Sequence, residues 1–153
     1  MARQSLEPTL DPADYPFTHH VRTRFAETDA MGIIHHAAYL PYLEEARVEY
    51  LRAIGHPYDS VRGEGAGDDG DAREFPVLEV SVQYRRPLRF DDEVAVSLRI
   101  GAVRGATFQI AYLLAVEGEA RATAVTVHGC VDTAGRPVRL PDWVRQRGGS
   151  GPG

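Results

Sequence analysis

The fold is decided by the stretch TDAMGIIHHAAY, residues 28–39, and by the helical pattern that continues from it to Gly55. Apolar and small side chains recur there at steps of four, three, four and three residues, which places them on one helical face: Tyr39, Leu43, Ala46, Tyr50 and Ala53. Gly55 is a natural helix stop, with Pro57 two residues beyond it. The sequence therefore predicts one long helix with a broad buried face, which begins just after a turn that carries Asp29.

The composition is that of one ordinary globular domain. The chain has 153 residues, of which 43% are hydrophobic and 25% charged, and its net charge is −5. This negative charge argues against a nucleic-acid partner. A single cysteine, Cys130, excludes an intrachain disulfide and a cysteine metal cluster. No apolar run approaches the length of a membrane span, and residues 1–16 lack the apolar core of a signal peptide, so we expect a cytoplasmic protein.

After residue 73 the pattern changes from the helical period to the alternation that is typical of strands. Together with an earlier alternating run, the predicted strands cover residues 17–27, 78–84, 94–100, 108–116 and 121–131. Short turns at 104–105 and 117–119 require antiparallel pairing. A single helix with a wide apolar face must be covered by such a sheet. We therefore predict an α+β domain with a curved antiparallel five-stranded sheet wrapped round one long central helix.

The chain divides into three parts around that domain. We expect a flexible leader over residues 1–16, a single domain over 17–145 and a disordered tail over 146–153. A Gly/Asp-rich loop at 63–71 is either a lid or an inert insertion. The edges of the sheet and its remaining apolar surface favour a second copy, so a homodimer or homotetramer is expected.

Two blocks of sequence carry a family resemblance. The run FAETDAMGIIHHAAYL at 25–40, followed by LEEAR at 43–47, resembles the signature of hotdog-fold acyl-CoA thioesterases. VQYRRPLRFDD at 82–92 is similar to a second block of the same proteins, and RGATF at 104–108 is a weaker third. The closest group is the 4-hydroxybenzoyl-CoA thioesterase family, including the members found with bacterial Tol–Pal genes. The resemblance covers roughly residues 18–145 and implies the hotdog fold and hydrolysis of an acyl-CoA to free acid and coenzyme A.

The resemblance also implies a catalytic arrangement at the start of the helix. Asp29 matches the nucleophile or general base, and the backbone N–H of His36 matches the group that polarises the thioester carbonyl, with Ala37 N–H beside it. A helix N-terminus suits this task because its N–H groups lack intrahelical partners and carry partial positive charge. From the residues alone, Asp29 could instead end a strand or cap a turn, and both His35 and His36 could be mere helix-start residues.

Several further residues are candidates for substrate binding. Basic side chains would hold the coenzyme A phosphates and the others would lie near the thioester or acyl group: His35, Met31, Tyr39, Arg85, Arg86 and Arg104. We expect no metal, because the adjacent His19-His20 and His35-His36 pairs diverge and no His-x-x-x-His motif with a glutamate occurs. No cofactor is expected beyond coenzyme A as part of the substrate.

Two alternatives and two departures from the family pattern remain at this point. The alternatives are an acyl carrier protein thioesterase, which the net charge does not favour, and a non-catalytic acyl-CoA-binding hotdog protein, which the presence of Asp29 does not favour. One departure is the Gly/Asp-rich loop at 63–71, which is longer than we expect for compact members. The other is Pro41, which fits only near the start of a helix. The regular helix therefore either begins at about residues 37–39 or bends at Pro41. The acyl group, the carrier, the subunit number and the role of Asp29 stay open.

Overall fold

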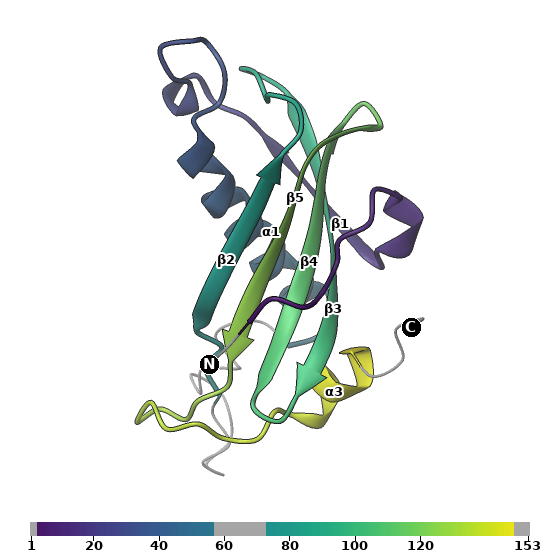
Figure 1. Cartoon of the computed structure of the whole chain (residues 1–153), viewed down its shortest axis with the longest axis vertical. Helices are drawn as coiled ribbons and strands as arrows, with labels where there is room; N and C mark the ends of the chain where they lie inside the picture. Colours follow the sequence, from purple (N-terminus) through teal and green to yellow (C-terminus); the bar gives the residue numbers. More distant parts are fainter. Residues whose placement is uncertain (1–2, 57–72, 149–153) are drawn as a thin grey trace.

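The computed structural model describes residues 3–56 and 73–148, and it has the predicted architecture. One long helix, α1, lies against a curved five-stranded sheet in which the strand order is β1-β3-β4-β5-β2 and every pair is antiparallel (Figure 1). The main elements are β1 (Phe17–Arg22), α1 (Tyr39–Ala53), β2 (Val77–Tyr84), β3 (Glu93–Arg104), β4 (Thr107–Val116), β5 (Glu119–Gly129) and α3 (Asp142–Gly148). The short 3-10 helices are η1 (Pro12–Asp14), η2 (Phe25–Glu27) and η3 (His36–Ala38).

The core lies between α1 and the inner face of the sheet. Most of the predicted helix face is buried there, namely Tyr39, Leu43, Ala46 and Tyr50, whereas Ala53 is exposed. Ala122 and Ala124 of β5 belong to the same core cluster. They share this cluster with Tyr39, Tyr42 and Tyr50 of α1.

The start of α1 resolves the question raised by Pro41. The short helix η3 leads directly into α1, which begins at Tyr39, so Pro41 lies in the first turn. A proline is tolerated there because the first N–H groups of a helix have no intrahelical acceptor. The prediction that the regular helix begins at about residues 37–39 is therefore confirmed, and this start lies beside the turn that carries Asp29.

The N-terminal segment differs from the loose leader that the sequence suggested. The backbone N–H groups of Ser5 and Leu6 donate to the side-chain oxygen of Gln109 at 3.0 and 2.9 Å, and the Gln109 amide donates to the Arg3 carbonyl at 3.0 Å. Tyr15 packs against residues of β4 on the outer face of the sheet. Residues 3–16 thus cover the face of the sheet that α1 leaves open (Figure 1).

Two further boundaries differ from the sequence analysis. The predicted strand over 17–27 is wrong in its second half, because β1 ends at Arg22 and residues 25–27 form η2. Residues 142–148 form α3, which packs on β3 with Val144 buried, so the ordered domain extends beyond residue 145. The Gly/Asp-rich loop at 63–71 and residues 149–153 lie outside the described residues.

A chain of buried hydrogen bonds crosses the core behind α1. An Arg47 guanidinium nitrogen lies 3.2 Å from Tyr112 Oη, which lies 2.9 Å from Thr126 Oγ1, which lies 2.8 Å from His128 Nε2. The other ring nitrogen of His128 lies 3.1 Å from the Phe75 carbonyl oxygen. With Arg47 donating at one end and the carbonyl accepting at the other, each polar group in between has a partner.

This chain makes the stability of the fold depend on pH. Burial, together with the nearby Arg47 charge, lowers the pKa of His128 from 6.5 to about 4. The unfolded chain therefore binds this proton at higher pH than the folded chain, and stability is lost as the pH falls from 6.5 toward 4. We expect His128 to account for a drop of about 3 kcal/mol in the free energy of unfolding between pH 7 and pH 4.

Urea unfolding of the wild type and of His128→Gln at both pH values measures this contribution. The variant has no titrating ring, so its free energy of unfolding should fall less between the two pH values. Equal drops in both proteins would contradict a neutral buried His128.

Candidate active site

The turn between η2 and η3 is a compact hairpin-like loop that fixes the position of Asp29. Thr28 and Ile34 form an isolated antiparallel bridge, and the Asp29 N–H donates to the Ile33 carbonyl at 2.8 Å. Gly32 has φ +79°, a conformation that L side chains rarely adopt, and its N–H donates to the Asp29 carbonyl at 3.0 Å. The loop is also attached to the segment between β2 and β3, because the Ile34 N–H donates to the Leu88 carbonyl.

The Asp29 carboxylate both caps this loop and retains an unused oxygen. Its Oδ1 accepts from the N–H of Met31 at 2.8 Å and from the N–H of Ile33 at 3.4 Å. Among the described residues no donor lies on Oδ2. The capping role that the sequence left open is therefore real, and it leaves one carboxylate oxygen available for chemistry.

The start of the helix leaves one N–H group without an acceptor. His35 is the N-cap of η3: its Nδ1 accepts from the Ala37 N–H at 3.0 Å and its carbonyl accepts from the Ala38 N–H at 2.9 Å. In residues 3–56 and 73–148, no acceptor is found for the His36 N–H. Of the two backbone donors suggested by the sequence, Ala37 is thus occupied by the His35 ring and His36 is available.

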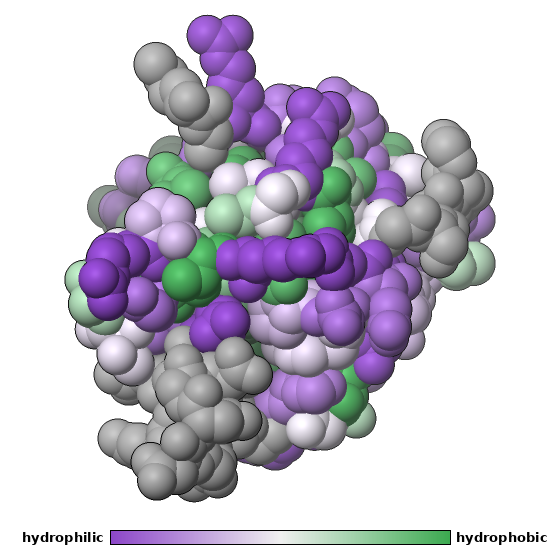
Figure 2. Space-filling view, turned by 90° about the horizontal axis from the view of Figure 1, so that it is seen from below, coloured by the Kyte–Doolittle hydropathy of each residue, from purple (hydrophilic) through white to green (hydrophobic). Residues whose placement is uncertain are grey.

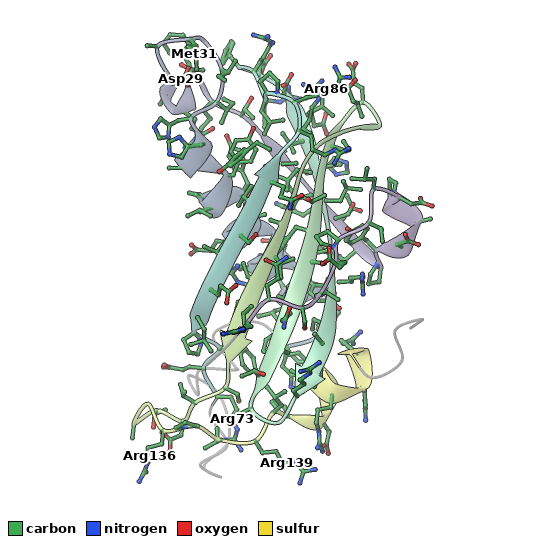
Figure 3. The ribbon with its side chains drawn as sticks, viewed as in Figure 1. Asp29, Met31, Arg73, Arg86, Arg136 and Arg139 are labelled. Atoms are coloured by element: carbon green, nitrogen blue, oxygen red, sulfur yellow. The ribbon has the colours of Figure 1, made fainter. Side chains whose placement is uncertain are left out.

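Asp29 and His36 line one pocket of about 390 Å³ at this end of the sheet. Its walls are Asp29, Met31, Ile33, Ile34, His36, Tyr39, Tyr84, Arg85, Arg86 and Pro87. Asp29, Met31 and Arg86 all lie at the same end of the molecule (Figure 3). The structure therefore brings most of the predicted site residues together from two separate stretches of the chain, 29–39 and 84–87.

The remaining predicted residues lie elsewhere. The His35 ring stacks on the His36 ring with centroids 4.2 Å apart. Neither His35 nor Ala37 lines the pocket. Arg104 pairs with Thr107 in the hairpin between β3 and β4, at the opposite end of the sheet from the Asp29 loop (Figures 1 and 3). Within one chain, Arg104 is therefore not part of this pocket.

Tyr84 is a pocket residue that the sequence analysis missed. Its hydroxyl donates to the His36 carbonyl at 2.9 Å, and its ring meets the Tyr39 ring edge-on at 4.8 Å. From the sequence, Tyr84 is assigned only to the predicted strand over 78–84, although it also belongs to the second block of the family resemblance, at 82–92. Its contact holds the peptide unit that follows His36 against the end of β2.

Glu27 is a second missed residue, and it ties the loop to the helix. Its carboxylate accepts from the Tyr42 hydroxyl at 2.6 Å and from the Arg24 N–H at 2.8 Å, while its carbonyl accepts from the His35 N–H at 2.7 Å. Burial acts to raise the pKa of Glu27, but the hydrogen bonds from Tyr42 and Arg24 outweigh it and leave the pKa below its usual value. A charged Glu27 thus links η2, the His35 cap and α1.

Two features are absent from the described residues, 3–56 and 73–148. No helix among them is long and apolar enough to cross a membrane. Within the same residues, no cluster of three or more His, Cys, Asp and Glu side chains is placed to bind a metal ion.

One long helix held against a curved antiparallel sheet, with Asp29 beside the helix start, is the architecture of the hotdog thioester hydrolases. Residues 23–148 match the family model described as the Thioesterase-like superfamily, and the chain belongs to this superfamily. The acyl-CoA thioesterase YbgC of Haemophilus influenzae is 29% identical over 133 residues, which cover 86% of this chain and 93% of that protein. These matches confirm the predicted family and the predicted enzyme class.

Solved structures agree with this assignment. A protein of Aquifex aeolicus is 37% identical, with a TM-score of 0.76 over 86% of this chain and 98% of that one. A thioesterase of Thermus thermophilus, solved with coenzyme A and Zn, is 28% identical, with a TM-score of 0.71 over 88% of this chain and 92% of that one. The predicted hotdog fold is therefore confirmed by proteins of closely similar length.

Proposed function

We propose that this thioester hydrolase cleaves an acyl-CoA to the free acid and coenzyme A in the pocket lined by Asp29 and His36. The observation that carries the proposal is the combination of an unpaired carboxylate oxygen and an unpaired helix-start N–H in one pocket. The first can act on the thioester carbon and the second can bind the carbonyl oxygen. The names of relatives that act on acyl-CoA or bind coenzyme A support the choice of substrate.

The His36 N–H supplies the electrostatic part of the mechanism. As the thioester carbonyl becomes tetrahedral, negative charge develops on its oxygen, and a fixed donor at a helix start stabilises that charge. The positive end of the α1 dipole acts in the same direction. The Tyr84 and His35 contacts hold the next peptide unit, between His36 and Ala37, in place, and so restrict movement of the neighbouring donor during the reaction.

Asp29 supplies the reacting oxygen in either of two ways. It can attack the thioester carbon, expel the coenzyme A thiolate and form an anhydride that water then hydrolyses. Alternatively, it can take a proton from a water molecule, which attacks the same carbon. Both routes consume one water and release one acid and one thiol.

The rest of the pocket suits the two ends of the substrate. Arg85 and Arg86 supply positive charge for the coenzyme A phosphates. Met31, which is 76% exposed, and Tyr39 supply apolar surface near the reacting carbon. Apart from coenzyme A within the substrate, this mechanism needs no cofactor.

Assembly of two or more copies is part of the proposal. β2 is an edge strand, and it exposes four large hydrophobic side chains: Val77, Leu78, Val80 and Tyr84. An open edge with apolar side chains favours pairing with a second copy. We propose a homodimer or homotetramer built along β2, which would also explain why Arg104 lies far from the pocket of its own chain.

Thiol release from a panel of acyl-CoAs tests the proposed function. Acetyl-, octanoyl- and benzoyl-CoA, assayed at equal concentration with a thiol reagent, should show hydrolysis of at least one substrate well above the rate without enzyme. The same acyl groups on acyl carrier protein serve as the comparison. Turnover of the carrier-protein substrates alone would replace acyl-CoA as the substrate, and no turnover of either series would overturn the proposal.

A further inference from the structure

The two groups that the proposed mechanism uses are spaced by a short ladder of backbone hydrogen bonds. The His35 N–H donates to the Glu27 carbonyl at 2.7 Å. Two residues further along, the Asp29 N–H donates to the Ile33 carbonyl at 2.8 Å. Asp29 lies on one arm of this ladder, and His36 follows directly after the other arm. The position of the Asp29 carboxylate relative to the His36 N–H therefore depends on how firmly the two arms are held.

The side chain of Glu27 fastens this ladder to the long helix. The Tyr42 hydroxyl of α1 donates to Glu27 Oε1 at 2.6 Å, and in the part of the chain that the structure describes this is the only side-chain hydrogen bond between residues 24–35 and α1. The Arg24 N–H donates to the same oxygen at 2.8 Å, and the Arg24 guanidinium pairs with Oε2 at 3.1 Å. The Glu27 side chain is only 12% exposed, so water competes little for these contacts.

The protonation states of the pair suit this task. The contacts from Tyr42 and Arg24 hold the pKa of Glu27 below its usual value against the opposing effect of burial, so the carboxylate is charged. Burial and the Glu27 hydrogen bond raise the pKa of the Tyr42 hydroxyl, which therefore stays a donor at neutral pH. A hydrogen bond to an ionised acceptor is roughly twice as strong as one between neutral groups. The pair thus forms a firm connection between the ladder and the start of α1.

We infer that Glu27 is a positioning residue for the hydrolysis, which sets the spacing between the Asp29 carboxylate and the His36 N–H. The inference rests on the proposed function, because it requires the His36 donor to act on the thioester. Glu27 itself does not line the Asp29 pocket, and its carboxylate is occupied by Tyr42 and Arg24. A displaced donor weakens the transition state more than substrate binding, because the charge that it stabilises develops only during the reaction.

Two variants remove the connection from opposite sides. Glu27→Gln keeps the size of the side chain, but its amide nitrogen cannot accept, so contacts from Tyr42 or Arg24 are lost. Tyr42→Phe keeps the Glu27 charge and removes the donor. Each should lower kcat for the best acyl-CoA of the panel by about tenfold and leave KM within about twofold of the wild type. Tyr15→Phe is a matched control, because the Tyr15 hydroxyl bonds to the Thr9 carbonyl on the outer face of the sheet, and it should keep the wild-type kcat.

A double-mutant cycle with His36→Pro shows whether Glu27 acts through the donor. Once the His36 N–H is absent, its position no longer matters. Glu27→Gln should therefore lower kcat by less than about twofold in the His36→Pro background, against about tenfold in the wild type. A purely structural role of Glu27 predicts the same loss in both backgrounds.

Asp132 provides the matched control for the loss of a charge. Its carboxylate also accepts backbone N–H groups and an arginine, with Ala134 N and Arg136 N at 2.9 Å and Arg136 Nε at 3.2 Å. Arg136 lies at the opposite end of the molecule from Asp29 (Figure 3). Many hydrophilic residues gather at that end (Figure 2). Asp132→Asn should therefore keep the wild-type kcat and KM.

Urea unfolding shows that each variant is folded before its rate is compared, and Tyr42→Phe supplies the comparison if Glu27→Gln does not fold. The inference is overturned if the folded variant keeps the wild-type kcat, if it changes KM rather than kcat, or if its loss is as large in the His36→Pro background. Each of these outcomes leaves hydrolysis by the wild type intact. No hydrolysis of any acyl-CoA by the wild type would instead overturn the proposed function, and this inference with it.

Discussion

Asp29→Asn is expected to lower kcat for acyl-CoA hydrolysis by about 10²- to 10⁴-fold, the range that a positioned general base or nucleophile supplies. The amide cannot accept a proton from water and is a poor nucleophile, so either proposed role would be lost. The amide oxygen of asparagine can still accept the hydrogen bonds of Met31 and Ile33, so the loop keeps its cap. Steady-state thiol release with the best substrate of the panel measures the effect.

The asparagine variant should be nearly as stable as the wild type, which urea unfolding checks. Asp14→Asn is the matched control, because Asp14 is an exposed carboxylate of the N-terminal segment, bonded to Thr9 and remote from the pocket. It should retain the wild-type rate. A folded Asp29→Asn variant with an unchanged rate would remove Asp29 from the mechanism and leave the hydrolase activity unexplained.

His36→Pro is expected to lower kcat by about 10²- to 10³-fold, the typical effect of removing one donor to the oxyanion. Proline deletes the backbone N–H at the position where the proposal needs it. The local backbone suits this change, because proline is favoured at the first position of a helix and His35, with φ −58° and ψ 138°, already has the conformation of a residue before proline. The deleted N–H has no acceptor in the described residues, so no protein hydrogen bond is lost.

His36→Ala is the partner variant that separates backbone from side chain. It keeps the N–H and removes the imidazole, so it should retain most of the activity if the backbone does the work. Loss of activity in His36→Ala equal to that in His36→Pro would assign the role to the ring instead. Thermal unfolding of both variants shows whether η3 still forms.

The central part of the fold could be predicted because it is encoded by periodicity. The four- and three-residue steps from Tyr39 to Tyr50 describe a helix face that is buried in the structure. The alternating rows that became β2 to β5 describe strands, and the short turns between three of them fix antiparallel neighbours.

The parts that could not be predicted depend on polar contacts between distant residues. The N-terminal segment is held by Gln109, whose partners lie more than 100 residues away in the chain. The pattern of apolar residues in the sequence does not predict such a contact. Similarly, the alternation of 17–27 continues past Arg22 in the sequence, whereas the Glu27 N–H donates to the Arg24 carbonyl and closes a turn of 3-10 helix instead.

Sequence reasoning could place the local part of the candidate site, but not the part that is assembled from distant segments. Asp29 and His36 come from one continuous stretch, so a sequence signature could place both. Tyr84 reaches the same pocket from the end of β2, and Glu27 acts through Tyr42 on the helix, which only a folded chain brings together. Arg104 could not be placed from the sequence either, since the register of β3 puts it at the opposite end of the sheet from the pocket of its own chain.

The docked N-terminal segment also determines how this protein can be shortened. A chain that starts at residue 17 would uncover Ala111 and Leu113 on β4 and strip the buried Gln109 amide of its Arg3, Ser5 and Leu6 partners. The newly exposed strip would be an apolar surface on the outer face of a sheet that already has an open edge. Deleting the N-terminal segment to aid crystallisation should therefore yield a protein that aggregates, whereas an affinity tag placed ahead of Met1 leaves the covering segment intact.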